Sequence, residues 1–431
     1  MRRVSILDRM SRTWGVGLVI LLLSGSLGAQ QASARPDSPL VAQLGLPLGA
    51  GADWRQWDSF LTNVVKTLGP QFPEARREQL GDLFLDSRYQ LVQTLSSGVS
   101  DPVPQLFLDT WGRLGPVLKQ AVSEVPPQIA GQYTGFISAM DGVASLGGAV
   151  QGLGLFKITP DALRSASTLL GMKTADPLAY TLDVDSALRT LLGFSGAPPP
   201  PPRLAPGVEL GLRGPVPSGD RPGPAPWRSL FLPPAYAADQ DFEKLNQLVP
   251  EGAQLSGYLT EVRQLLTNAG TAALAKTQLA PPYQPLYHQI VFAAAWQESC
   301  WRQFVRKGDK MTPLASATGD VGLMQVNRNT WRGLYDLNGL SGDIVYNSSA
   351  GSEILLYYLS RFAVRKREDK QPGGNLARAT YSAYNGGPGQ LGRYRNPKTP
   401  TVWKKVDDAF WTKFRAVSAG QELAVKSCYG K

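Results

Sequence analysis

Apolar residues recur at the spacing of helical turns through most of residues 50 to 195. One face of the first expected helix carries Trp54, Trp57, Phe60, Leu61, Val64, Val65 and Leu68, and Gly69-Pro70 ends it. The same period continues from residue 84 to 95 and from 106 to 122, and it returns after Thr159-Pro160-Asp161 and from 183 to 194. The pattern predicts a helical domain over residues 50–195, but it does not indicate what that domain does.

The stretch between Val125 and Phe156 is different, because glycine and alanine abound there and Asp141 is its only charge. Small side chains let helices approach one another closely, which favours packing inside a bundle. A membrane-contacting hairpin is the alternative. Asp141 argues against it, since a charge is expensive in lipid.

Helical spacing resumes after residue 240, and residues 240–280 are expected to pack onto the domain that follows. In the stretch Tyr287–Val305, written YHQIVFAAAWQESCWRQFV, Glu298 lies on the same stripe as Ile290 and Ala294. Burial disfavours the charged form of a carboxyl group and raises its pKa, as a general acid requires. A lone glutamate near a helix end more often points to solvent, so Glu298 needs support from elsewhere in the chain.

Two later segments supply that support: Ser316–Asn327 reads SATGDVGLMQVN, and Ala383–Gly387 reads AYNGG. Together with Glu298-Ser299, and in this order, they resemble the soluble lytic transglycosylase family, the lysozyme-like enzymes that cut bacterial peptidoglycan. The resemblance covers roughly residues 284 to 400. It implies an all-α chain with a lysozyme-like catalytic domain at its C-terminal end. The interval after Glu298 is several residues longer than in the family, which places an insertion around Lys307–Leu314.

The resemblance also implies roles for individual residues, with Glu298 as the catalytic residue. The expected substrate-binding residues are Ser299, Ser316, Gly322, Met324, Gln325, Asn327, Tyr384 and Asn385. Glycine at 322 would let the backbone approach the sugar, and the amides of Gln325 and Asn327 would contact its acetamido and hydroxyl groups. Tyr384 is expected to steady the Glu298 carboxyl. No cofactor and no metal are implied, and the expected partner is the glycan strand of peptidoglycan.

Most glycosidases need two carboxylates beside the scissile bond, whereas the resemblance supplies one. In the family, one glutamate protonates the oxygen that links N-acetylmuramic acid to N-acetylglucosamine. It then takes the proton from the muramic acid 6-hydroxyl, which closes on C1 to give a 1,6-anhydro end. Two alternatives stay open. Asp320 could activate water, as in a hydrolytic muramidase of the goose-type lysozyme kind, or the chain could chiefly scaffold an envelope machine through a partner of residues 50–195.

A change in composition separates the two halves of the chain. Residues 197–234 are rich in proline and glycine, with five consecutive prolines at 198–202. Such a stretch is typical of an extended spacer without a packed core. The expected organisation is a signal segment (residues 1–34), a helical domain (50–195), the spacer (197–234) and the catalytic domain (240–431).

The formal net charge of +10 comes entirely from residues 283–431, where 21 lysines and arginines face 11 aspartates and glutamates. Nucleic acid is the usual partner of such a surplus. Export from the cytoplasm would exclude nucleic acid, so anionic cell-wall polymers or a membrane surface fit better. An ordinary solvated face explains the surplus equally well.

Cys300 and Cys428 are the two cysteines, and in an oxidising compartment an even number of cysteines suggests a disulfide. This bond would tie the C-terminal tail to the helix that carries Glu298. A buried free thiol at Cys300 is the alternative. The single histidine, His288, is expected to pack against its neighbours, so the sequence offers no metal-binding constellation.

The first residues follow the order of a secretory signal. Arg2, Arg3, Arg9 and Arg12 precede an apolar run from Trp14 to Leu23, and Ala32-Ser33-Ala34 offers a cleavage site. The run is too short to span a bilayer comfortably, where about 20 residues are needed. The sequence therefore predicts a protein of the periplasm or cell envelope, with an uncleaved anchor as the alternative.

We expect the mature chain to begin near Arg35, because cleavage after Ala34 would remove the whole signal. N-terminal sequencing of the protein purified from its native compartment tests this. An intact Met1 on a cytoplasmic protein would contradict the prediction.

Overall fold

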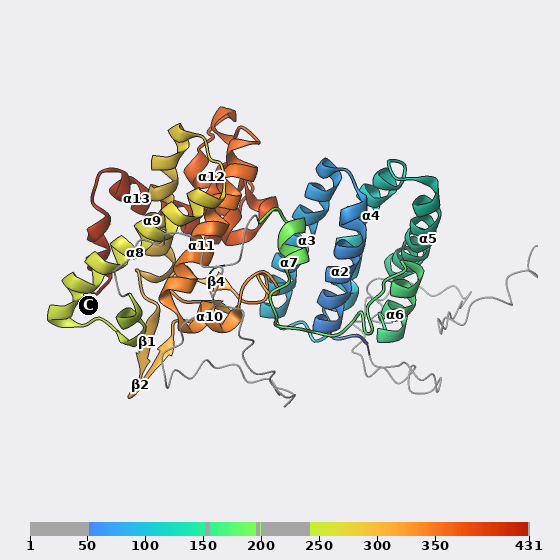
Figure 1. Cartoon of the computed structure of the whole chain (residues 1–431), viewed down its shortest axis with the longest axis horizontal. Helices are drawn as coiled ribbons and strands as arrows, with labels where there is room; N and C mark the ends of the chain where they lie inside the picture. Colours follow the sequence, from blue (N-terminus) through green and yellow to red (C-terminus); the bar gives the residue numbers. More distant parts are fainter. Residues whose placement is uncertain (1–50, 151–155, 195–198, 200–241, 430–431) are drawn as a thin grey trace, which may run out of the picture. The chain divides into compact units, whose positions relative to one another are not determined.

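The computed structural model describes residues 51–150, 156–194, 199 and 242–429 (Figure 1). The predicted signal segment and, apart from Pro199, the predicted spacer lie outside the described residues. The chain divides into two compact units. The first comprises Met1–Phe84 and Val99–Tyr180, and the second comprises Leu85–Gly98 and Thr181–Lys431. Helices dominate both units and only four short strands occur in the described residues, so the fold is all-α as predicted.

The described helices of the first unit are α2 (Trp54–Leu68), the beginning of α3 (Glu74–Ser96), α4 (Val103–Val122), α5 (Pro127–Ala149) and α6 (Pro160–Leu169). Helix α2 begins where it does because Asp53 caps it. The Asp53 carboxylate accepts the N–H groups of Arg55 and Gln56 at 2.9 Å, and the Gln56 side chain accepts the Asp53 N–H at 3.0 Å. This reciprocal pair satisfies donors that an uncapped helix leaves free. The predicted entry at Thr159 is confirmed by the hydrogen bond that its hydroxyl accepts from Ala162.

Aromatic contacts and polar contacts to Asp141 hold α4 against its neighbours. Phe107 meets Trp57 of α2 edge to face, and Trp111 meets Phe136 of α5 in the same way. The indole N–H of Trp111 also donates to Asp141 at 3.0 Å, so the lone charge of the glycine-rich stretch is used inside the bundle. Across the part of the chain that the structure describes, none of the helices combines the length and apolarity needed to cross a bilayer.

The second unit is larger. Besides the end of α3, its helices are α7 (Ser186–Leu191), α8 (Leu255–Lys276), α9 (Gln284–Ser299), α10 (Leu337–Gly342), α11 (Ile344–Tyr358), α12 (Leu376–Gly386) and α13 (Thr401–Ser418). Its strands are β1 (Phe304–Lys307), β2 (Lys310–Pro313), β3 (Asp320–Val321) and β4 (Val326–Asn327), paired as two antiparallel ribbons. Helix α11 is buried on nearly every face and contacts α8, α9, α10 and α12. A helix without a polar face belongs in the centre of a core, and α11 fills that position (Figure 1).

The ribbon β1–β2 lies where the sequence places an insertion. Lys307 pairs with Lys310 across a two-residue turn, and Gly308 in that turn has φ +58°. Positive φ is the geometry that two-residue hairpin turns demand, and glycine adopts it without steric cost. The residues of the predicted insertion thus lie in a two-stranded hairpin (Figure 1).

Helix α9 is shorter than the spacing of its apolar residues predicts. That spacing suggests a helix that reaches Val305, but the helix ends at Ser299, and Val305 lies in β1. Cys300 and Trp301 take φ values of +55° and +63°, in the left-handed region that terminates a helix. Glu298 therefore lies in the last turn of α9.

The predicted disulfide between Cys300 and Cys428 is present, with the two Cα atoms 6.1 Å apart. Two further contacts hold the same junction. The hydroxyl of Tyr429 donates to the carbonyl of Cys300 at 2.7 Å, and Arg302 donates to the carbonyl of Cys428 at 2.9 Å. The C-terminal segment is thereby fastened to the end of the helix that carries Glu298.

Two segments that precede the proline-rich stretch belong to the second unit, whereas the sequence predicts a catalytic domain that begins at residue 240. One segment is Leu85–Gly98, and the other begins at Thr181 and includes α7. The ring of Phe194 stacks on Tyr357 with centroids 4.8 Å apart. Arg189 is 3% exposed and forms an ion pair with Glu353 of α11 at 3.1 Å. These buried contacts make the upstream segments part of the core of this unit.

Replacing Arg189 with methionine is expected to destabilise the second unit by about 3–5 kcal/mol, because Glu353 would stay buried without its closest cation. Arg164→Met is the matched control. Its ion pair with Asp161 is solvent-exposed, and loss of such a pair changes stability by about 1 kcal/mol or less. Urea unfolding of the full-length variants measures both. Equal losses in the two variants would contradict the prediction.

Candidate active site

Glu298 meets a tyrosine of another helix. The hydroxyl of Tyr381, on α12, donates to Oε1 of Glu298 at 2.8 Å. The Tyr381 ring stacks on Phe410 of α13 with centroids 4.1 Å apart and an interplanar angle of 2°. Helices α9, α12 and α13 thus meet around one half-buried carboxyl group.

The surroundings of Glu298 make it a weak acid. Burial raises its pKa from an ordinary value of 4.5 to about 7. The Tyr381 hydrogen bond lowers the pKa, the negative charge of Asp320 raises it, and the positive charges of Lys413 and Arg393 lower it. Burial outweighs the opposing contributions because it disfavours the carboxylate directly. Near neutral pH a substantial fraction of Glu298 therefore holds its proton.

Ser299 connects the end of α9 to the Gly-Leu-Met-Gln turn. Its buried hydroxyl donates to the carbonyl of Leu323 at 2.6 Å and accepts the N–H of Arg302 at 3.1 Å. Both contacts are internal. Ser299 therefore fixes the distance between the end of α9 and the turn.

The turn itself is shaped by buried side chains. Gly322 has φ +75°, and a Cβ at this position would lie 2.5 Å from side-chain atoms of Gln303 and Asn347. Any larger residue would clash, so packing alone requires the glycine. Met324 is fully buried, and its N–H donates to Asn347 at 2.7 Å. The Gln325 side chain donates to the carbonyl of Gly322 at 2.8 Å, which closes the turn.

Asp320 is the centre of a small hydrogen-bonded cluster. Its carboxylate accepts the hydroxyls of Ser316 and Thr318, each at 2.5 Å, and the amide of Asn327 at 2.8 Å. The carbonyl oxygen of the Asn327 side chain accepts the N–H groups of Asn329 and Thr330 at 3.0 Å. Ser316 and Asn327 therefore hold the β3–β4 ribbon around Asp320.

The tyrosine that contacts Glu298 is Tyr381 and not Tyr384, which the sequence analysis favours. The Tyr384 hydroxyl donates instead to the carbonyl of Met324 at 2.6 Å. The two tyrosines are three residues apart on α12, so they share one helix face. That spacing is the signal that could have identified Tyr381 in the sequence.

Asn385 is held by a buried ion pair. Nη1 of Arg393 donates to the Asn385 side-chain oxygen at 3.1 Å, while Nη2 lies 2.6 Å from Asp407. Ser382 donates to the same Asp407 carboxylate at 3.0 Å. This network fixes the orientation of the Asn385 amide, and neither Arg393 nor Asp407 was expected from the sequence.

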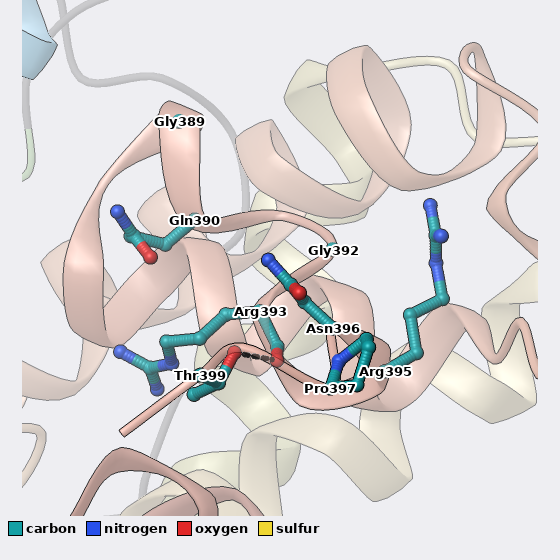
Figure 2. Close-up of a pocket in the computed structure, with 8 residues that line it drawn as sticks. All are labelled: Gly389, Gln390, Gly392, Arg393, Arg395, Asn396, Pro397 and Thr399. Atoms are coloured by element: carbon teal, nitrogen blue, oxygen red, sulfur yellow. Dashed lines mark hydrogen bonds between the residues drawn. The ribbon is translucent and has the colours of Figure 1, made fainter.

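A polar cavity of about 390 Å³ adjoins this network (Figure 2). Its lining residues are Gly389, Gln390, Gly392, Arg393, Arg395, Asn396, Pro397 and Thr399. Figure 2 shows Thr399 beside the Arg393 backbone, where its hydroxyl donates to the carbonyl at 2.6 Å. Arg393 is paired with Asp407 and Arg395 with Glu368, so both cations of the cavity are balanced by acids. Glu298 does not line this cavity.

Lys413 of α13 is a further charge near Glu298 that the motifs do not include. Its ammonium group donates to the side-chain oxygen of Gln297 at 2.6 Å. Burial lowers the pKa of Lys413, and the negative charge of Glu298 opposes that shift. Lys413 therefore contributes a partly desolvated positive charge at the edge of the site.

Within the described residues, no group of three or more His, Cys, Asp or Glu side chains has the arrangement of a metal site. His288 is half-buried and packs against Gly270 of α8, where a Cβ would lie 2.9 Å from the imidazole. Burial lowers the pKa of His288, which favours its neutral form.

The stretch that contains Glu298, the Gly-Leu-Met-Gln turn and the Ala-Tyr-Asn helix end matches a known domain. Residues 284–402 match the family model of the transglycosylase SLT domain. The chain carries a transglycosylase SLT domain. The SLT domain is lysozyme-like, and its presence supports an enzyme that acts on peptidoglycan. The search of curated proteins and the search of solved structures each return no match.

The SLT domain begins at the first residue of α9 and ends within the first turn of α13. Glu298, Tyr381 and the Gly-Leu-Met-Gln turn lie inside it. Lys413 and the second half of the disulfide lie beyond it, and the segment Leu85–Gly98 lies far upstream. The compact unit is therefore considerably larger than the SLT domain.

Two substitutions should move the pKa of Glu298 in opposite directions. Tyr381→Phe removes a hydrogen bond that favours the carboxylate, so the pKa should rise above about 7. Asp320→Asn removes a nearby negative charge, so the pKa should fall. Carbon NMR titration of labelled glutamate carboxyl groups measures both, with Glu298→Gln identifying the signal. Shifts of the same sign would contradict this electrostatic account.

Proposed function

We propose that this protein is a lytic transglycosylase. It cleaves the β-1,4 bond between N-acetylmuramic acid and N-acetylglucosamine and leaves 1,6-anhydromuramic acid ends. The observation that carries the proposal is the single carboxyl group of Glu298, whose pKa is raised to about 7 inside the SLT domain. Such a group can give up a proton and take one back near neutral pH.

In the first step Glu298 donates its proton to the glycosidic oxygen. The bond from that oxygen to C1 of the muramic acid breaks, and N-acetylglucosamine leaves with a new hydroxyl. Glu298 is now a carboxylate in a desolvated site. The Tyr381 hydroxyl at 2.8 Å and the charges of Lys413 and Arg393 stabilise it.

In the second step the carboxylate removes the proton from the muramic acid 6-hydroxyl, and the oxygen closes on C1. Glu298 returns to its protonated form, no water is consumed, and the new bond makes the 1,6-anhydro ring. The nucleophile belongs to the substrate, so its effective concentration is high. One protein carboxyl group is therefore sufficient for both proton transfers.

The role of Asp320 separates this reaction from hydrolysis. A hydrolytic muramidase would need a second carboxylate to activate water. Asp320 lies close enough to affect the pKa of Glu298, but it already accepts three hydrogen bonds from Ser316, Thr318 and Asn327. These bonds support a structural role for Asp320, which holds the β3–β4 ribbon. Most acceptor sites of its carboxylate are already occupied.

We also propose two kinds of role for the remaining motif residues. Gln325 and Asn385 keep amide hydrogens or oxygens for the acetamido and hydroxyl groups of the sugar. The other expected binding residues contribute mainly by fixing the cleft through the internal contacts described above: Ser299, Ser316, Gly322, Met324, Asn327 and Tyr384.

The proposed place of action is the periplasm or cell envelope, because peptidoglycan is the substrate of SLT domains. Residues 1–34 would direct export and be removed. The first unit is the candidate site for an envelope protein partner, because it lies outside the SLT domain and forms its own helical core.

Glu298→Gln is expected to abolish cleavage and leave the fold intact, because the amide keeps the shape and cannot transfer a proton. General acid–base roles are worth about 100- to 10,000-fold each, and this residue fills both. Asp320→Asn is the matched control and should cost much less. Mass spectrometry of muropeptides released from purified peptidoglycan should find ends lighter by one water than a lysozyme product.

Two results would count against the proposal. Reducing-end muramic acid as the main product, with a severe Asp320→Asn defect, would make the protein a hydrolytic muramidase. Full activity in Glu298→Gln would remove the assignment of the catalytic group.

A further inference from the structure

The C-terminal end of α12 leaves several backbone carbonyls without helical partners, and that of Tyr384 is one of them. The carbonyl of Tyr384 would receive the N–H of the residue four positions later, which is Pro388. Proline has no N–H, and the chain has already turned away at Gly387, where φ is +94°. An outside donor is therefore needed, because an unpaired buried carbonyl is costly.

Tyr89 supplies that donor. Its hydroxyl donates to the carbonyl of Tyr384 at 2.9 Å and accepts the hydroxyl of Tyr358 at 3.2 Å. Its ring also packs against the turn, since a Cβ on Gly387 would lie 2.9 Å from the ring carbons. Tyr89 is buried, so water does not compete for these contacts.

Two residues just before Tyr89 fix the beginning of its segment. Asp86 accepts the N–H of Gly389 at 2.9 Å, just beyond the turn that Tyr89 covers. Arg88 donates to the carbonyl of Arg332 at 2.5 Å and to that of Thr330 at 3.2 Å. The segment Leu85–Gly98 is thus fastened to α12 and to the loop that precedes α10.

A short series of hydrogen bonds leads from Tyr89 to the reacting group. Tyr89 holds the backbone of Tyr384, and the Tyr384 hydroxyl holds the carbonyl of Met324 at 2.6 Å. The carbonyl of the preceding residue, Leu323, is held by Ser299 at 2.6 Å, next to Glu298. A displaced Tyr384 would therefore move the turn that faces Glu298.

We propose that Tyr89 is a positioning residue for the reaction of the SLT domain, although it lies 195 residues before that domain begins. It touches neither the substrate nor Glu298. It acts by replacing the donor that Pro388 lacks, which holds Tyr384 and the Gly-Leu-Met-Gln turn at the distance from Glu298 that the reaction needs. The inference rests on the proposed function.

The test is Tyr89→Phe in the full-length protein, which keeps the ring against Gly387 and removes only the hydroxyl. Tyr287→Phe is the matched control, because its buried hydroxyl also donates to a backbone carbonyl, that of Ser352 at 2.8 Å. Tyr89→Phe loses two buried hydrogen bonds and Tyr287→Phe loses one, so both melting temperatures should fall, and that of Tyr89→Phe should fall further. A small displacement of reacting groups greatly slows catalysis, so kcat should fall about tenfold in Tyr89→Phe alone, with KM within about twofold of wild type.

A kcat that is unchanged in Tyr89→Phe, or lowered equally in both variants, would reduce Tyr89 to a stabilising residue and overturn the inference. The kcat of each variant is divided by that of wild type, and both are measured on whichever product the wild-type enzyme releases. A reducing-end product would therefore refute the proposed reaction, and the ratio would still decide the role of Tyr89.

Discussion

The site depends on the hydrogen bond between the Tyr381 hydroxyl and the Glu298 carboxyl. Burial alone would hold the proton too tightly for it to be given up, and the tyrosine, with two nearby cations, offsets part of that penalty. This balance of contributions to the pKa of Glu298 requires three helices at fixed relative positions. Helix α9 carries the acid, α12 carries the tyrosine, and α13 carries Phe410 and Lys413. The packing around α11 can be understood as the scaffold that keeps this register.

Short-range patterns predicted much of this arrangement. The apolar period identified the helices, and three short motifs identified Glu298 and the turn opposite it. The spacing of apolar residues predicted a longer α9 than the structure has. The left-handed backbone at Cys300 and Trp301 ends the helix, and it cannot be detected from hydrophobic spacing. Tyr381 was missed because the Ala-Tyr-Asn motif drew attention to its neighbour on the same helix face.

The remaining contacts could not be predicted, for a different reason. Arg189 and Glu353 are 164 residues apart, and Tyr89 and Tyr384 are 295 residues apart. Nothing in the local sequence around either partner indicates the other, because these residues lie in separate helices far apart along the chain. The proline-rich stretch also suggested a clean boundary, whereas the second unit draws on segments from both sides of it. A proline-rich composition predicts a spacer between domains, but it does not predict which of the flanking segments pack together.

The discontinuity of the second unit has a consequence for how the enzyme is made. Bringing distant segments together requires the closure of long loops, and folds dominated by such contacts form slowly. Residues 85–98 leave the ribosome long before α12, and the cysteine that completes the disulfide follows later still. Burial in the folded unit raises the pKa of Glu298, so this shift requires those segments to have come together. The raised pKa is therefore acquired only on folding, and a partly synthesised chain carries Glu298 without it.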